Sequence, residues 1–286
     1  MAELETAASA AGDALAAVGA WDVERKAAAV VVPDGVVAST GDRRARFPLA
    51  SVTKPIAALA ILVAVEEGTL DLDAPAGPPG ATVRHLLAHA AGLGFDGGIV
   101  APPGTRRTYS NAGFDALADA LAQAAGISAA EYVAEAVLAP LGMGATDLPD
   151  GSLAHGAWST AADLARFAGE LLRPTLVSPA TLAEATSVQF PGMRGVLPGF
   201  GAQDPNDWGL GFERRDHKSP HWTGRTNDPG TFGHFGQAGT FLWVDPTLDA
   251  ALVVLTDRPF GPWAAAAWPA LSDDVVRALA AAPPTA

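Results

Sequence analysis

The 286-residue sequence contains no cysteine, which excludes disulfide bonds, thiolate nucleophiles and cysteine-ligated metals. Lysine and tyrosine are scarce as well. The chain has only Lys26, Lys54 and Lys218, and its only tyrosines are Tyr109 and Tyr132. Because these residue types are so few, a lysine or a tyrosine at a spacing that suits proton transfer is informative.

Long apolar runs and an excess of basic residues are also missing. No apolar stretch reaches the roughly 20 residues that cross a bilayer, and segment 1–19 lacks the basic start of a signal peptide. We therefore expect a cytoplasmic protein without a membrane partner. The net charge of −13 disfavours nucleic acid as a partner. A hydrophobic content of 49% and a charged content of 17% are typical of an ordered globular protein.

Strand-forming runs lie at both ends of the chain, with helix-forming segments between them. Strands are expected at 27–32, 36–39, 208–214, 231–236, 239–244 and 250–256. Helices are expected at 3–18, 51–68, 82–89, 114–125, 128–138, 160–172 and 271–280, and an irregular loop at 190–207. This order predicts an α+β fold in a single domain, 1–286. One antiparallel sheet is built from both termini (roughly 1–68 and 208–286), with an inserted helical lobe (roughly 69–207).

Ser51 and Lys54 form the most informative pair of residues. Residues three apart on a helix share a face, so the hydroxyl and the amine are expected to lie within reach of each other. Serine becomes a nucleophile when a base takes its proton, and a partly desolvated lysine can be that base. Pro55 suits a first helical turn, and an apolar run follows at 56–65. The pattern predicts a nucleophilic serine at the start of a buried helix, although Ser51 as a simple helix cap is the alternative.

Two other segments carry side chains or backbone groups suited to the same chemistry. Tyr109 and Asn111 precede a predicted helix; a phenol can relay protons if a nearby ammonium lowers its pKa, and the amide can hold the lysine or a substrate carbonyl. Segment 233–239, Gly-His-Phe-Gly-Gln-Ala-Gly, opens a predicted strand. A main-chain N–H there is expected to pair with that of Ser51 as an oxyanion hole. Alternatively, Tyr109 is a packed aromatic and His234 only bonds locally.

Taken in order, these segments resemble the motifs of the serine β-lactamase and penicillin-binding-protein-like superfamily. The resemblance is to the class C-like branch, which includes family VIII esterases and D-amino-acid peptidases. The S-x-x-K motif matches Ser51 and Lys54, Y-x-N matches Tyr109 and Asn111, and H-x-G matches 234–236. The match covers roughly residues 25–280. It implies a five-stranded antiparallel sheet flanked by helices, with Tyr109 on a helical lobe.

The resemblance also implies roles for these residues. It implies that Ser51, Lys54 and Tyr109 catalyse the reaction through an acyl-enzyme. It also implies that the substrate and its oxyanion are contacted by Asn111, His234, Gly236 and Gln237. No metal or cofactor is implied. His85 and His89 have metal-ligand spacing, but Leu86 stands where a zinc protease has glutamate, so we interpret both histidines as structural.

The third motif departs from the β-lactamase pattern. His234 replaces the usual lysine, Phe235 replaces the usual threonine, and the chain is short for the branch. These differences favour an esterase or amidase that acts on small acyl substrates. The alternatives are a D-amino-acid peptidase or weak penicillin-binding protein or β-lactamase, and a non-catalytic homologue that binds a peptide or acyl ligand. Nothing in the sequence indicates the oligomeric state.

Overall fold

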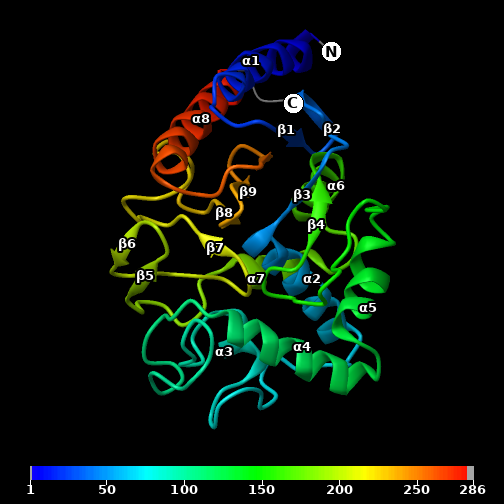
Figure 1. The fold of residues 1–286 in the computed structure, drawn as a ribbon, viewed down its shortest axis with the longest axis vertical. Helices are drawn as coiled ribbons and strands as arrows, with labels where there is room; N and C mark the ends of the chain where they lie inside the picture. Colours follow the sequence, from blue (N-terminus) through cyan, green and yellow to red (C-terminus); the bar gives the residue numbers. More distant parts are fainter. Residues whose placement is uncertain (1, 282–286) are drawn as a thin grey trace.

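A central antiparallel sheet joins strands from the two ends of the chain in this computed structural model, which describes residues 2–281 (Figure 1). The strand order is β2-β1-β10-β9-β8-β7. The bounds are β1 Lys26–Val32, β2 Gly35–Gly41, β7 Glu213–Arg214, β8 Phe232–Gly236, β9 Thr240–Asp245 and β10 Ala250–Thr256. The predicted five-stranded sheet is therefore present, and the two-residue strand β7 extends its edge.

Helices cover both faces of this sheet because its strands are apolar on both sides. Ala28 and Val30 of β1 pack in one cluster with α1 (Ala2–Gly19) and α8 (Pro262–Ala280), which lie together in Figure 1. Ala29 and Val31 point to the other face, where α6 (Ala161–Leu172) packs on β1 and β10. Thus α6 lies within 69–207 in sequence, yet it packs against the sheet.

Helix α2 (Thr53–Glu66) passes through the middle of the protein and follows a short 3₁₀ turn, η1 (Ala50–Val52). Every residue from Thr53 to Ala64 is buried, as expected for a helix that is apolar on all sides. The predicted buried helix after Ser51 is confirmed. Ser51 itself lies on the 3₁₀ turn, one residue before Val52 and two before the α-helix begins.

Most of the remaining helices have a serine or threonine at the N-cap, whose hydroxyl accepts a hydrogen bond from a free backbone N–H of the first turn. The remaining helices are α3 (Val83–Leu87), α4 (Asn111–Ala125), α5 (Ala129–Val133), the π-helix η2 (Ala134–Leu138) and α7 (Pro179–Thr186). Thr82 caps α3 and Thr160 caps α6, as their positions before apolar segments predict. Ser110 caps α4 in the same way, which places Tyr109 immediately before that helix.

Several predicted boundaries are wrong. Of the strand expected at 208–214 only Glu213 and Arg214 pair with β8, because Gly211 takes a positive φ and turns the chain. The loop expected at 190–207 contains a hairpin of β5 (Gly195–Leu197) and β6 (Gly201–Gln203). Helix α7 and the small pair of β3 (Arg46–Pro48) with β4 (Trp158–Thr160) were not predicted.

The closing helix is also longer than 271–280, because α8 begins at Pro262 and continues through Pro269. Among the described residues, no helix has both the length and the apolar character needed to cross a membrane.

Shortening a core side chain on α2 should destabilise the fold. Ile61 is fully buried, so Ile61→Ala removes apolar contacts and leaves a cavity. We expect the free energy of unfolding to fall by about 2–5 kcal/mol in urea denaturation. Val196→Ala is the control, because the Val196 side chain is 55% exposed. Equal stability of the two variants would contradict the central position of α2.

Candidate active site

Ser51 follows a residue whose backbone conformation is strained. Ala50, immediately before it, has φ of 46°, a left-handed conformation that costs a non-glycine residue of order 1 kcal/mol. The chain around the turn is held by Leu49, whose N–H donates to the Ala157 carbonyl over 2.8 Å. Thr53 adds a bond from its hydroxyl to the Ala50 carbonyl over 2.7 Å. Ser51 is thereby presented at the start of α2 with its side chain half-buried.

Lys54 points from the first turn of α2 into a fully buried position beside Ser51. Its Nζ lies 3.4 Å from Ser51 Oγ, 2.8 Å from Asn111 Oδ1 and 2.8 Å from the carbonyl oxygen of Ala154. The predicted proximity of Ser51, Lys54 and Asn111 is therefore confirmed in the structure. Ala154 was not predicted, since a backbone carbonyl 100 residues away leaves no mark in the sequence.

The environment of Lys54 favours the neutral amine. Burial lowers the pKa of Lys54 well below its ordinary value, and the carboxylate of Asp115 offsets this only in part. A neutral amine has two N–H groups, which match the two acceptors at 2.8 Å. The nitrogen lone pair is then left for Ser51 Oγ.

Tyr109 completes this cluster from the other side of Ser51. Its hydroxyl donates a hydrogen bond of 2.6 Å to Ser51 Oγ, and Lys54 Nζ lies 4.7 Å from the centre of its ring. Burial raises the pKa of Tyr109, and the bond to Ser51 offsets this only partly. The expected lowering of this pKa by an ammonium is therefore not found, because the ring is enclosed by aromatic groups such as His89 and Trp208. Tyr109 is a neutral phenol that keeps its proton.

The end of β8 approaches the Ser51 turn very closely, and Gly236 makes this possible. A Cβ on Gly236 would lie 2.2 Å from the Leu49 carbonyl oxygen and 2.5 Å from Thr240 Oγ1. Thr240 Oγ1 in turn donates to the same carbonyl over 2.9 Å. Gln237 follows directly and lines the same cavity as Ser51. The structure thus brings the third predicted segment to the serine.

His234 is buried in the wall of this cavity with only 3% of its surface exposed. Its Nδ1 is 2.7 Å from the carbonyl oxygen of Phe235, so Nδ1 carries the hydrogen and donates it. Nε2 has no hydrogen-bond partner. Burial lowers the pKa of His234 to about 3, and the imidazole is therefore neutral at ordinary pH. The local hydrogen bond expected for His234 is present, and the residue also lines the cavity, while its contact with a substrate stays a prediction.

The cavity next to Ser51 has a volume of about 140 Å³ and is mainly apolar. It is lined by Ser51, Phe95, Tyr109, Leu197, Pro198, Trp208, Glu213, His234, Phe235 and Gln237. A larger hollow of about 620 Å³ lies between β2 and α6, but none of the residues around Ser51 lines it. We therefore place the candidate site at the smaller cavity, where the reactive groups are.

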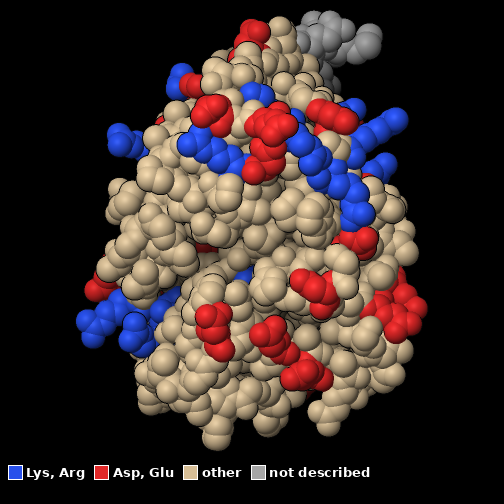
Figure 2. Space-filling model, viewed as in Figure 1, with Lys and Arg blue, Asp and Glu red and all other residues tan. Residues whose placement is uncertain are grey.

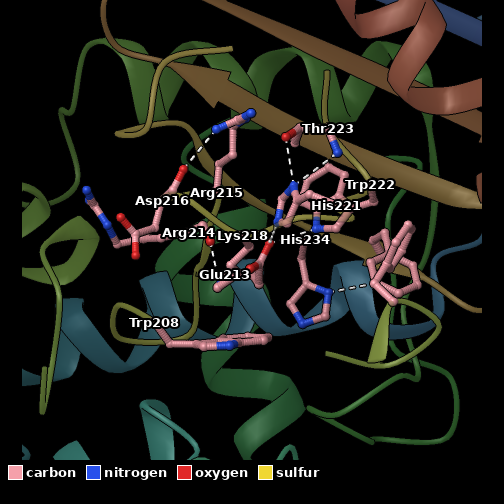
Figure 3. A network of polar contacts seen from close by, with 12 residues as sticks. Trp208, Glu213, Arg214, Arg215, Asp216, Lys218, His221, Trp222, Thr223 and His234 are labelled. Atoms are coloured by element: carbon pink, nitrogen blue, oxygen red, sulfur yellow. Dashed lines mark hydrogen bonds and ion pairs between the residues drawn. The ribbon is translucent and has the colours of Figure 1, made fainter. Parts of the chain in front are cut away.

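Sequence reasoning missed Glu213, which lines this cavity from β7. Its carboxylate accepts hydrogen bonds from Lys218 Nζ, from His221 Nε2 over 2.8 Å and from Trp222 Nε1 over 2.7 Å (Figure 3). Burial alone raises the pKa of Glu213, but the charges and hydrogen bonds of His221 and Lys218 lower it to about 2. Glu213 lay in the strand expected at 208–214 without an assigned role, and only the tertiary structure shows that it is buried beside the cavity.

The two histidines at metal-ligand spacing have other partners. His85 Nδ1 is 2.9 Å from Thr82 Oγ1, and His89 Nδ1 accepts the N–H of Ser110 over 3.2 Å. Helix α3 ends at Leu87, so the two rings do not share a helical face. Within residues 2–281 no three histidine, aspartate or glutamate side chains come together as a metal site.

Comparison with known proteins shows which family and which solved structures this chain is similar to. The model of the Beta-lactamase family matches residues 16–277. The fold is similar to the crystal structure of a beta-lactamase from Mycobacterium bovis, with 58% sequence identity, a TM-score of 0.92 and coverage of 93% of this chain and 99% of that chain. The hydrolase EstCE1, which has promiscuous acyltransferase activity, shares the fold at 19% identity and a TM-score of 0.74, covering 96% of this chain and 98% of that one.

A curated relative matches only locally. Esterase EstB from Burkholderia gladioli is 46% identical over a segment that covers 17% of this chain and 16% of the esterase. The chain thus matches less than a fifth of the length of that relative.

A side chain at Gly236 should separate β8 from the Ser51 turn. In Gly236→Ala the new methyl meets two oxygen atoms within 2.5 Å, so the backbone must shift. Because misplacement by about 1 Å can cost about a hundredfold in rate, we expect labelling of Ser51 by a fluorophosphonate to slow by about that factor. Gly169→Ala on α6 is the control, since no atom lies within 4 Å of its added methyl. Labelling of Gly236→Ala at the wild-type rate would show that the close approach is dispensable.

Proposed function

The chain belongs to the beta-lactamase family of serine hydrolases, and we propose that it forms an acyl-enzyme on Ser51 and hydrolyses small neutral esters. One observation carries the proposal. Ser51 Oγ lies between the Tyr109 hydroxyl and the Lys54 amine, at the edge of a small apolar cavity. A nucleophile, a base and an acyl-binding space are thus adjacent.

Acylation begins when Ser51 Oγ attacks the substrate carbonyl carbon. As the new C–O bond forms, the serine proton passes to the lone pair of Lys54 Nζ. Asn111 Oδ1 and the Ala154 carbonyl hold the two other hydrogens of the amine, which aims the lone pair at Ser51. Burial makes the amine available as a base at a lower pH than for an exposed lysine.

Tyr109 is suited to deliver a proton to the leaving group. Its hydroxyl touches Ser51 Oγ, so it also lies close to the bond that breaks. When the C–O bond to the leaving alkoxide breaks, the phenol supplies the proton, and the ammonium of Lys54 restores it. Because the pKa of Lys54 is lowered and that of Tyr109 is raised, the return of the proton to the phenol is favourable. The same groups then activate water for deacylation.

The oxyanion of the tetrahedral intermediate is assigned to two main-chain N–H groups, those of Ser51 and Gln237. Gly236 brings the backbone of β8 within van der Waals contact of the Ser51 turn, which supports this pairing. Two such donors, fixed in advance, stabilise the developing negative charge without reorganisation.

The cavity supports an ester in preference to a β-lactam. None of its lining residues is a lysine or an arginine, and His234 is neutral, so a substrate carboxylate finds no cationic partner there. A dry cavity of about 150 Å³ accommodates a benzene molecule, so the volume of about 140 Å³ suits a short acyl group. The similarity to esterase EstB over part of the chain agrees with this preference.

Hydrolysis of a β-lactam or of a D-amino-acid peptide is the second candidate. It is favoured by the 58% identity to the Mycobacterium bovis protein, which is described as a beta-lactamase. A non-catalytic ligand-binding homologue is a third possibility, and the intact cluster of Ser51, Lys54 and Tyr109 argues against it.

Lys54→Arg should remove the base while keeping a long nitrogen-bearing side chain at this position. Arginine stays protonated at working pH and has no lone pair to accept the serine proton. We expect kcat/KM for p-nitrophenyl butyrate to fall by more than about tenfold, or 1.4 kcal/mol in barrier. Lys26→Arg is the matched control, because Lys26 only binds the carbonyls of Gly19 and Trp21 at the surface. Turnover by Lys54→Arg at the level of Lys26→Arg would refute the role of Lys54.

The choice of substrate can be decided by comparing p-nitrophenyl butyrate with nitrocefin. We expect kcat/KM to be larger for the ester by about tenfold or more, equivalent to 1.4 kcal/mol, because the cavity offers nothing to the carboxylate of nitrocefin. Ser51→Ala should abolish both reactions and also covalent labelling by a fluorophosphonate. A tenfold advantage of nitrocefin would establish the second candidate instead, and full activity of Ser51→Ala would refute the nucleophile.

A further inference from the structure

Four aromatic side chains, those of Phe95, Tyr109, Trp208 and Phe235, line the cavity beside Ser51 together with Glu213. The rings of Phe95, Tyr109 and Trp208 lie near one another, with centroid separations of 6.0 Å for Phe95 and Tyr109 and 5.8 Å for Tyr109 and Trp208. The Glu213 side chain is buried, and its carboxylate accepts hydrogen bonds from Lys218, His221 and Trp222. Aromatic faces and carboxylates both attract cations, and aromatic cages are a known way to bind quaternary ammonium groups.

The ion pair of Glu213 with Lys218 has its negative end at the cavity. Glu213 is a lining residue, whereas Lys218 is not. Lys218 Nζ donates to the carbonyl oxygens of Asp207, at 2.7 Å, and Arg214, and it lies 5.7 Å from the centre of the Trp208 ring. Figure 3 shows Glu213 between Lys218 and His221, on the side of the network that faces Trp208 and His234. The carboxylate is therefore rigidly placed by the three donors around it.

His234 adds a buried hydrogen-bond acceptor for which residues 2–281 supply no donor. Because its Nδ1 hydrogen is bound by the Phe235 carbonyl, Nε2 presents a lone pair. That atom is buried without a partner, in a side chain that lines the cavity. A buried acceptor without a donor is unfavourable, so a ligand that brings a positively polarised group gains by covering it.

Building on the proposed ester hydrolysis, we propose that this cavity selects acyl groups that carry a small ammonium group. The cationic group lies among Phe95, Tyr109 and Trp208 and is attracted by Glu213 and by Nε2 of His234. A carboxylate in the same place meets a negative charge and a lone pair. The net charge of −13, with acidic side chains spread over the face in Figure 2, adds a general attraction for cations.

A panel of three p-nitrophenyl esters tests this selectivity in the wild-type protein. The acyl groups are 4-(trimethylammonio)butyryl, its neutral isostere 5,5-dimethylhexanoyl, and the anionic glutaryl half-ester. Because aromatic faces attract a desolvated cation, we expect kcat/KM for the cationic ester to exceed that for the isostere by about tenfold or more. The anionic ester should be the poorest of the three.

Glu213→Gln separates the carboxylate from the general charge of the protein. We expect the cationic ester to lose most of its advantage over the isostere in this variant. Glu170→Gln is the matched control. Glu170 is a buried glutamate on α6 that binds Thr175 and Leu176, and its loss changes the net charge by the same amount. The ratio of the two esters should be unchanged in the control.

The outcomes distinguish this inference from the function on which it rests. If the neutral isostere is hydrolysed by wild type at least as well as the cationic ester, the cation preference is wrong and ester hydrolysis stands. If the preference survives in Glu213→Gln, Glu213 does not cause it and the inference is overturned. If no ester is hydrolysed, the proposed function fails and the inference with it. Should Glu213→Gln not fold, the wild-type panel alone decides.

Discussion

Burial of the Lys54 amine is the constraint on which the rest of the site depends. An ammonium at this position without partners would destabilise the protein by several kcal/mol. The structure meets this demand with two acceptors from distant segments, Asn111 Oδ1 and the Ala154 carbonyl, and with a lowered pKa. These contacts fix α4 and the 154–157 segment against α2. The same contacts that make burial tolerable also orient the lone pair toward Ser51.

A second constraint is the close approach of β8 to the Ser51 turn. Gly236 has no Cβ, and Thr240 binds the Leu49 carbonyl, so a strand from the end of the chain reaches a helix near its start. The strand that approaches Ser51 is also part of the central sheet, because β8 pairs with β9 on one side and with Glu213 of β7 on the other. The wall of the cavity is thereby continuous with the central sheet.

The polar groups around the cavity divide into satisfied and unsatisfied ones. Glu213 accepts bonds from Lys218, His221 and Trp222, and this ion pair is buried together with its hydrogen-bond partners. His234 Nε2 lacks such a partner. Unsatisfied buried groups in native proteins are uncommon and call for an explanation, and contact with a ligand is the one that we favour here.

The sequence by itself determined the α+β class, most helices and strands, and the motifs around Ser51, Tyr109 and Gly236, because apolar periodicity, capping residues and motif spacing are local signals. It failed where local signals mislead. Segment 208–214 is strand-like but turns at Gly211, and α7 and the β5–β6 hairpin lack a clear pattern. Only the tertiary structure decided that Ala154 and Glu213 join the site, that burial lowers the pKa values of Lys54 and His234, and that burial raises the pKa of Tyr109. Burial and long-range contacts set these properties, and neither is encoded in the spacing of residues along the chain.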